Sequence, residues 1–127
     1  MQEQAQKEQK LLERAAIAVG INGAWSESRR GIEVQDENGN VVKVWNPLTD
    51  DGDNSRLEGR LSMSIMWYPQ DVWMTCYWHD VSVGYHVFDG DRQSTRRLAS
   101  VKLAAKIGRA MQVQGVSRVE DLREPKM

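Results

Sequence analysis

Cysteine is almost absent from this sequence. Cys76 is the only cysteine among 127 residues, so no disulfide can form within the chain. A protein without disulfides suits a reducing compartment such as the cytoplasm. A chain of this length can bury about two-thirds of its unfolded surface in one domain without covalent cross-links. We therefore predict a single domain over residues 1–127, with frayed ends at about 1–5 and 116–127.

Long apolar runs and an excess of one charge are also lacking. No run approaches the roughly 18 apolar residues that a membrane-spanning helix needs. The polar segment Met1–Lys10 lacks the apolar centre of a secretory signal. The formal net charge of −1 argues against nucleic acid or a membrane surface as a partner. The sequence thus predicts a cytoplasmic protein without membrane contact.

Three segments show apolar residues at helical spacing. Residues 3–19 predict an N-terminal helix that Gly20 ends. A short middle helix is predicted around residues 53–61, with a preceding aspartate as its cap. A long helix is predicted from about residue 94 to 113. Its apolar face carries Leu103, Ile107 and Met111.

Alternation of apolar and polar residues predicts five strands. They are residues 32–35, 42–45, 62–68, 72–78 and 81–88. Asn38-Gly39 tolerates positive φ and predicts the turn of a first hairpin, whereas Ser26–Arg30 before it is predicted to be a polar connection. His79-Asp80 is the predicted tip of a second hairpin, and residues 62–68 link the two.

The order of these elements predicts an α+β fold. Short turns between neighbouring strands imply antiparallel pairing. We expect an antiparallel sheet of about five strands, formed by two hairpins and the linking strand. An N-terminal helix, a short middle helix and a long C-terminal helix are layered on it.

The second predicted hairpin has two unlike faces. With His79-Asp80 at the tip, Cys76 lies on an apolar face that belongs in the core, and Trp73 pairs with His86 on the opposite face. That second face is either covered by a helix or exposed for contact. Because Trp and Tyr dominate interface energies, an exposed face would be a binding surface. The candidate protein-contact residues are Trp73, Tyr77 and His86.

Three stretches are distinctive in combination. They are Lys10-Leu11-Leu12 before an alanine-rich helix, the run from Trp45 to Asp53 (WNPLTDDGD), and Thr95-Arg96-Arg97 before the alanine-rich segment 104–111. Together they resemble small accessory proteins of phages and prophages, similar to the phage ABA sandwich domain group. Residues 54–60 depart from that group, being more polar and containing Gly59. The resemblance implies a phage origin and a layered α/β sandwich, and it implies no established activity.

Asp50, Asp51 and Asp53 form an acidic cluster before the middle helix. Several carboxylates can hold a hard divalent cation. The register of a calcium-binding EF-hand loop fails, however, because Arg56 stands where that loop needs glycine. Acids before a helix also cap its free N–H groups and favour its dipole. We therefore prefer capping to metal binding.

Catalytic groups are not assembled in the sequence. Cys76 and His86 point to opposite faces of the predicted hairpin, so with His79 they cannot converge on zinc or form a nucleophilic pair. No phosphate-binding loop and no glycine-flanked serine occurs. The sequence predicts a protein that is not an enzyme and holds no catalytic residue, metal or cofactor.

Basic residues gather in the long helix. The candidate contacts for phosphate or another anion are Arg96, Arg97, Lys102, Lys106 and Arg109. The last three fall on one stripe at helical spacing. No aromatic residue lies among them to stack on bases, so we prefer a solvated surface to a nucleic-acid site.

These features lead to three functional hypotheses. The leading one is a non-enzymatic, phage-encoded interaction protein that binds and modulates a host macromolecule in the host cytoplasm, such as a component of defence or transcription. A host protein is the expected partner, and a homo-oligomer is a second arrangement. The first alternative is a protein that sequesters a small molecule or nucleotide signal. The second is a metal-dependent hydrolase that uses the aspartate cluster.

Overall fold

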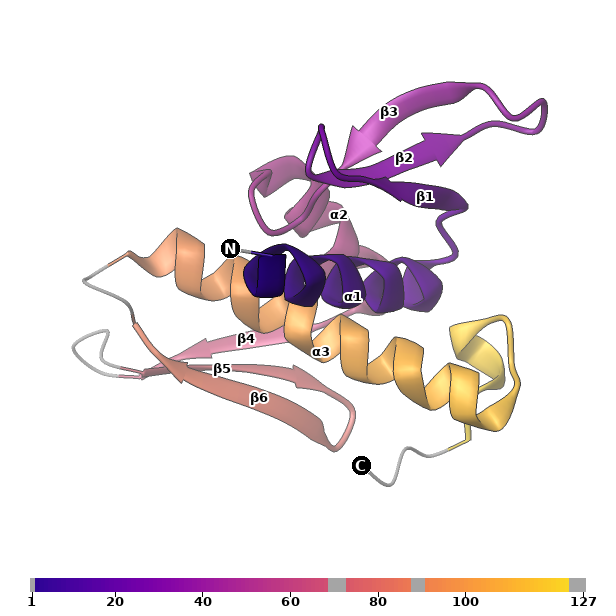
Figure 1. The fold of residues 1–127 in the computed structure, drawn as a ribbon. Coiled ribbons are helices and arrows are strands. Elements are labelled where there is room, and N and C mark those ends of the chain that lie inside the picture. The colour runs from indigo at the N-terminus through magenta and orange to yellow at the C-terminus, as the bar shows by residue number, and fades with distance from the viewer. Residues whose placement is uncertain (1, 69–72, 88–90, 124–127) are drawn as a thin grey trace.

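Three α-helices and two antiparallel sheets make up the fold (Figure 1). The computed structural model describes residues 2–68, 73–87 and 91–123. The helices are α1 (Gln2–Val19), α2 (Asp51–Leu61) and α3 (Arg92–Gln114). The first sheet contains β1 (Gly23–Ser26), β2 (Gly31–Gln35) and β3 (Val41–Trp45), and the second contains β4 (Ser64–Trp67), β5 (Trp73–Trp78) and β6 (Val81–His86).

The helices lie between the two sheets (Figure 1). Helix α1 packs along α3 and also contacts β1 and β2, whereas α3 covers β5 and β6. Each sheet therefore has one face toward the helices and one face turned outward. The predicted α+β class, with an N-terminal and a long C-terminal helix, is confirmed. The prediction of one sheet of about five strands is wrong, because the described residues form two three-stranded sheets.

The strands divide into two sheets because α2 separates the hairpins. The predicted linking strand appears as β4, but it pairs only with the second hairpin, through β5. Strand β1, which the sequence pattern does not predict, completes the first sheet by placing Trp25 opposite Ile32. Its four residues contain no β-branched side chain. Such a short edge strand takes its conformation from its neighbour, and a local pattern does not encode that pairing.

The two predicted hairpins are present. In the first, Gly39 has φ +82°, which the turn between β2 and β3 requires. In the second, Trp78 pairs with Val81, and Trp73 pairs with His86, as the register at the His79-Asp80 tip predicts. Val72 and Phe88, at the ends of the predicted strands, lie outside the described residues.

Helix α3 is the centre of the core. Leu103, Ile107 and Met111 are fully buried, as predicted. Gly108 lets α1 approach closely, because a Cβ at this position would collide with the carbonyl oxygen of Arg14. The middle helix is also confirmed, and its Leu57 is buried in the same core. The central place of α3, between α1 and the second sheet, explains why so much of its surface is apolar or small.

The described chain begins in a helix and packs against the core near its C-terminal end. Residues 2–5 form the first turn of α1. After α3, the chain makes a short 3-10 helix, η2 (Val119–Asp121), and Val116 and Leu122 pack against the core. The Gln114 side chain accepts a 2.8 Å hydrogen bond from the backbone N–H of Arg123. None of the helices in the described part of the chain is both long and apolar enough to cross a membrane.

Candidate functional site

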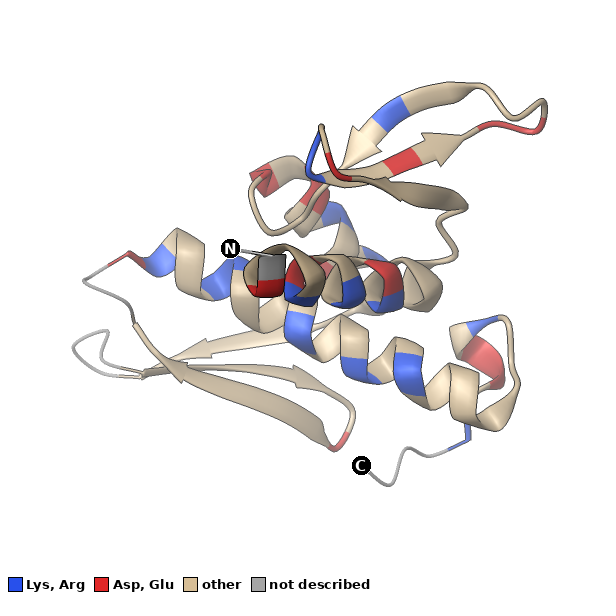
Figure 2. Ribbon diagram, in the orientation of Figure 1, with Lys and Arg blue, Asp and Glu red and all other residues tan. Residues whose placement is uncertain are grey.

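The second sheet has an outward-facing surface that we call the outer face. The residues on this face are Ser64, Met66, Tyr68, Trp73, Thr75, Tyr77, Ser82, Gly84 and His86. No described helix or strand lies over it (Figure 1). None of the nine residues is Asp, Glu, Lys or Arg, and Figure 2 shows β4, β5 and β6 free of these charged residues. A sheet face beside water ordinarily carries polar and charged side chains, so this composition is unusual.

Trp73 is held in one orientation on the outer face. Its indole N–H donates a 3.0 Å hydrogen bond to the hydroxyl of Thr75. Its ring meets the imidazole of His86 edge to face, with 4.8 Å between the ring centroids. The same ring covers Gly84, where a Cβ would lie 2.5 Å from the indole. Glycine at this position therefore makes room for the tryptophan to lie flat on the sheet.

Three hydroxyl groups organise the other part of the outer face. Tyr68 forms side-chain hydrogen bonds with Tyr77 and with Thr75. The bond between the tyrosines lowers the pKa of Tyr68 and raises the pKa of Tyr77. Thr75 is buried although it points outward, because aromatic side chains surround it. The face is thus pre-organised by its own contacts.

The outer face remains accessible. Met66 is 51% exposed and Tyr68 is 38% exposed. Trp73 and Tyr77 are half-buried, and His86 is exposed. Of the three predicted contact residues, Trp73 and His86 touch, and Tyr77 lies further along β5 on the same face. The prediction omitted Met66 and Tyr68 as contact residues, although the alternation of residues 62–68 continues to both.

The five predicted anion-binding residues do not form one free cationic surface. Arg96 makes a paired contact with buried Glu58, with a shortest distance of 2.7 Å. Arg97 pairs with Asp51 at 2.6 Å and donates to the carbonyl oxygen of Leu48. Both arginines therefore join α3 to the segment containing α2. The remaining three are Lys102, which is half-buried, and Lys106 and Arg109, which are exposed.

The aspartate cluster is divided among separate contacts. Asp50 caps α2 by accepting a 2.8 Å hydrogen bond from the N–H of Asp53, as the capping prediction expects. Asp53 is buried and accepts from Lys43 at 2.8 Å and from Arg56 at 2.7 Å. Burial raises the pKa of Asp53, but the hydrogen bonds from Lys43, Arg56 and the backbone of Asn46 more than offset this and lower it. The carboxylates of Asp50 and Asp53 therefore already bind backbone N–H groups and cationic side chains of the protein itself.

The run from Trp45 to Asp53, which carries much of the phage resemblance, forms an internal junction. The Asn46 side chain donates to the carbonyl oxygen of Arg30 at 2.5 Å and accepts from the N–H of Leu48. Just beyond the run, Asn54 donates to the carbonyl oxygen of Pro47 and to the hydroxyl of Ser100. These bonds connect the first sheet, α2 and α3, so the geometry gives this run a structural role.

Cys76 is a core residue in the second sheet. It is fully buried, and its thiol lies 3.7 Å from the sulfur of Met63. Burial raises the pKa of the Cys76 thiol to about 12, so little nucleophilic thiolate forms at neutral pH. His86 lies on the opposite face, as predicted. Within the described residues, no group of three or more His, Cys, Asp or Glu side chains could hold a metal ion.

Comparison with protein-family models, with curated proteins and with solved structures gives no match to this chain. The resemblance to phage accessory proteins therefore stays a prediction.

Proposed function

We propose that this protein is a non-enzymatic interaction protein that binds a partner protein through the outer face. The observation that carries this proposal is an accessible, uncharged sheet face built from aromatic side chains and Met66. The centres of protein–protein interfaces are enriched in aromatic residues and methionine and depleted of charge. The contacts that fix Trp73 and Tyr68 also reduce the entropy lost on binding.

A host macromolecule is the partner that we propose. The phage-like stretches of the sequence support this choice, because an accessory protein of a phage acts on components of its host cell. A host protein fits the outer face better than nucleic acid does, since this surface offers no Lys or Arg to a phosphate backbone. A second copy of the chain is the competing partner, because uncharged sheet faces also associate with themselves.

The arrangement of charges favours this function over the two alternatives. A nucleotide-binding protein would use the aromatic platform and the basic helix together, but α3 packs on the sheet face opposite to the outer face. A metal-dependent hydrolase would use the aspartates, but Asp51 and Asp53 are paired with Arg97 and with Lys43 and Arg56. The geometry therefore supports an interaction protein best.

Affinity capture from host lysate, followed by calorimetry with the captured protein, tests the proposal. We expect one stoichiometric host protein whose binding is weakened by Tyr77→Ser and Met66→Ser. The matched control is Val42→Ser, which removes a side chain that is 60% exposed on β3, in the other sheet. Equal binding by all variants would show that the partner uses another surface. Dimerisation that Tyr77→Ser abolishes, with no captured protein, would replace the host partner by a second copy.

A further inference from the structure

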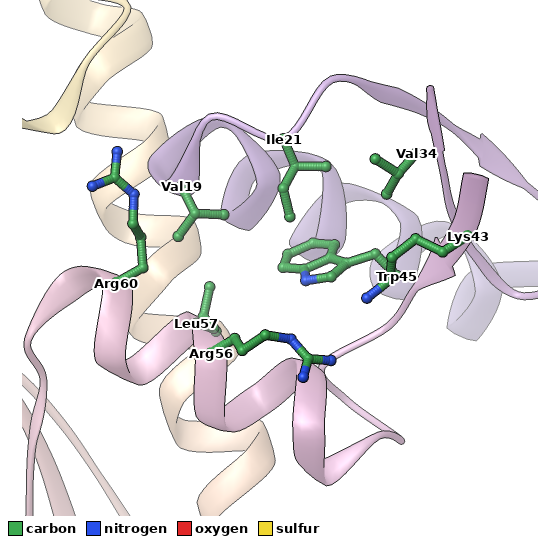
Figure 3. Close-up of a pocket in the computed structure, with 8 residues that line it drawn as sticks. All are labelled: Val19, Ile21, Val34, Lys43, Trp45, Arg56, Leu57 and Arg60. Carbon is green, nitrogen blue, oxygen red and sulfur yellow. The ribbon is translucent and has the colours of Figure 1, made fainter. Parts of the chain in front are cut away.

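A pocket lies between the first sheet and the helices, far from the outer face (Figure 3). Its volume is about 240 Å³. Trp45 of β3 and Val34 of β2 form one wall, Val19 and Ile21 at the end of α1 form a second, and Leu57 of α2 forms the third. We call it the Trp45 pocket.

The apolar part of the pocket is built by side chains that packing and backbone hydrogen bonds hold in place. Trp45 and Leu57 are buried in the main core. Gly20, with φ +72°, reverses the chain after α1, and the N–H of Ile21 then bonds to the carbonyl oxygen of Ala16 at 2.9 Å. This capping arrangement holds Ile21 over the helix end. The pocket is therefore pre-formed, as small-molecule sites usually are.

The rim of the Trp45 pocket is cationic. Lys43, Arg56 and Arg60 line it beside the apolar wall, with Arg56 and Arg60 toward opposite ends (Figure 3). Lys43 and Arg56 share the one buried carboxylate of Asp53, so positive charge is left in excess. Their side chains are still 43% and 66% exposed and can reach a ligand. Arg60 is also exposed, and its contact with Glu120 is long, at 4.0 Å.

We infer that the Trp45 pocket binds a small amphipathic anion. The apolar wall accepts one or two aromatic rings or a short alkyl chain, and the rim binds a carboxylate, sulfonate or phosphate. A pocket of this size is below the roughly 300–1,000 Å³ typical of drug-sized ligands, so the ligand is small. Guanidinium groups pair with such anions through two parallel hydrogen bonds, which favours the anion over a neutral analogue.

The same observations distinguish this pocket from two other hollows of the described surface. The hollow lined by Asp51, Asn54, Glu58 and Arg96 is polar. Its charged groups already form ion pairs, because Glu58 binds Arg96 and Asp51 binds an arginine of α3. The hollow beside Gln114 and Arg123 is lined by a chain segment that bonds to itself. Only the Trp45 pocket, among these, combines a large apolar wall with an excess of one charge.

Titration with 2-naphthoate, monitored in ¹H–¹⁵N correlation spectra, tests the inference. The indole N–H signal of Trp45, assigned through a Trp45→Phe variant, is expected to shift in a saturable way with a dissociation constant in the millimolar range or tighter, about −4 kcal/mol or better. The indole signal of Trp73, on the outer face, is expected to stay unchanged. The neutral isostere 2-naphthamide is expected to bind about tenfold more weakly.

Two substitutions separate the pocket from general charge attraction. Arg60→Gln removes a rim cation outside the Asp53 contacts, and we expect about threefold weaker binding of 2-naphthoate with an unchanged melting temperature. Arg109→Gln removes an exposed cation of α3 that does not line the pocket, and we expect no change. The inference is overturned by the absence of saturable shifts, by equal affinity for 2-naphthamide, or by equal effects of the two substitutions.

Discussion

The two sheets have the same size and topology but are attached to the helices in different ways. The first sheet is connected by polar contacts, namely Lys43 to Asp53, the Asn46 backbone to Asp53, and Arg30 to Glu8 at 2.6 Å, in addition to buried Ile32 and Trp45. The second sheet lies on α3 through Met74, Cys76 and Trp78, which are all buried. One attachment is thus partly electrostatic, and the other is apolar.

The outward faces differ in the same sense. The outward face of the first sheet carries Glu33, and the sheet ends in an acidic turn with Asp36 and Glu37, whereas the second sheet carries no Asp, Glu, Lys or Arg in its strands (Figure 2). Charged side chains keep a sheet in solution and discourage contacts with other chains. Their absence from the second sheet is the reason for assigning the protein contact to the outer face. The cationic rim of the Trp45 pocket, between the first sheet and α2, is the reason for assigning the small anion there.

The largest effect that we expect concerns the reactivity of Cys76. A pKa of about 12, compared with the ordinary 9.0, reduces the thiolate population about a thousandfold at neutral pH, because three pKa units separate the two values. Labelling of the native protein with a thiol reagent should therefore be slower than labelling in denaturant by at least about this factor, because the buried thiol is also shielded from the reagent. A Ser82→Cys change in a Cys76→Ala background places a thiol on the outer face and should label rapidly. Fast labelling of native Cys76 would contradict the apolar attachment of the second sheet.

Removal of the Asp53 carboxylate should loosen the first sheet. In Asp53→Ala, Lys43 and Arg56 lose their shared partner and the buried N–H of Asn46 loses its acceptor. We expect the free energy of unfolding to fall by about 2 kcal/mol, mainly because the buried N–H of Asn46 is left without an acceptor, since Lys43 and Arg56 remain partly exposed to water. Urea denaturation measures this loss, and Glu37→Ala, at an exposed position in the turn of the same sheet, is the control. A loss below about 1 kcal/mol would show that apolar contacts alone hold the first sheet.

Substitutions on the outer face should affect binding more than folding. Because no described helix covers the outer face, which carries Trp73 and Tyr77, we expect Trp73→Ser and Tyr77→Ser to weaken partner binding by about 2 kcal/mol or more and to leave the protein folded. Calorimetry for binding and circular dichroism for folding separate the two effects. If Trp73→Ser instead destabilises the fold by about 3 kcal/mol or more, as truncation of a core aromatic residue does, Trp73 belongs to the core and the contact hypothesis fails.

The cap of α3 should make a smaller contribution. Asp91 accepts hydrogen bonds from the N–H of Ser94 at 3.0 Å and from its hydroxyl at 2.7 Å. We expect Asp91→Ala to cost about 1 kcal/mol of stability, and Asp91→Asn, which keeps a capping oxygen, to cost less. Thermal denaturation of both variants measures the difference. Equal losses would show that the capping oxygen is not what matters at this position.

The smallest effect that we expect is the loss of stability at low pH that follows protonation of Asp53. The lowered pKa of Asp53 means that its stabilising contribution is present above its ordinary pKa of 3.8 and is lost as pH falls through its lower value in the folded protein. At pH values around and below 3.8 the unfolded carboxyl takes up a proton before the folded one does, so the folded state loses stability. Hydrogen-exchange protection factors, corrected for the slower intrinsic exchange at lower pH, should therefore fall in β2 and β3 before β5. A simultaneous fall in both sheets would remove the distinction between them.

Local pattern was sufficient for several parts of this fold. Gly20 ends α1, Gly39 makes the first hairpin turn and an aspartate caps α2, because each depends on residues only a few positions apart. The register of the second hairpin followed from its tip, so the opposite placement of Cys76 and His86 could also be predicted. The candidate contact residues Trp73, Tyr77 and His86 came from that register.

Long-range contacts decided the rest. Strand β1 exists through its pairing with β2, and α2 directs the two hairpins into separate sheets with the helices between them. The sequence by itself determined the helices, the two hairpins and which residues share a face, since these follow from short-range periodicity and turn geometry. Only the tertiary structure decided that no described helix covers the outer face, that Arg96 and Arg97 pair with acids, and that the Trp45 pocket exists, because these depend on how elements distant in the chain pack together.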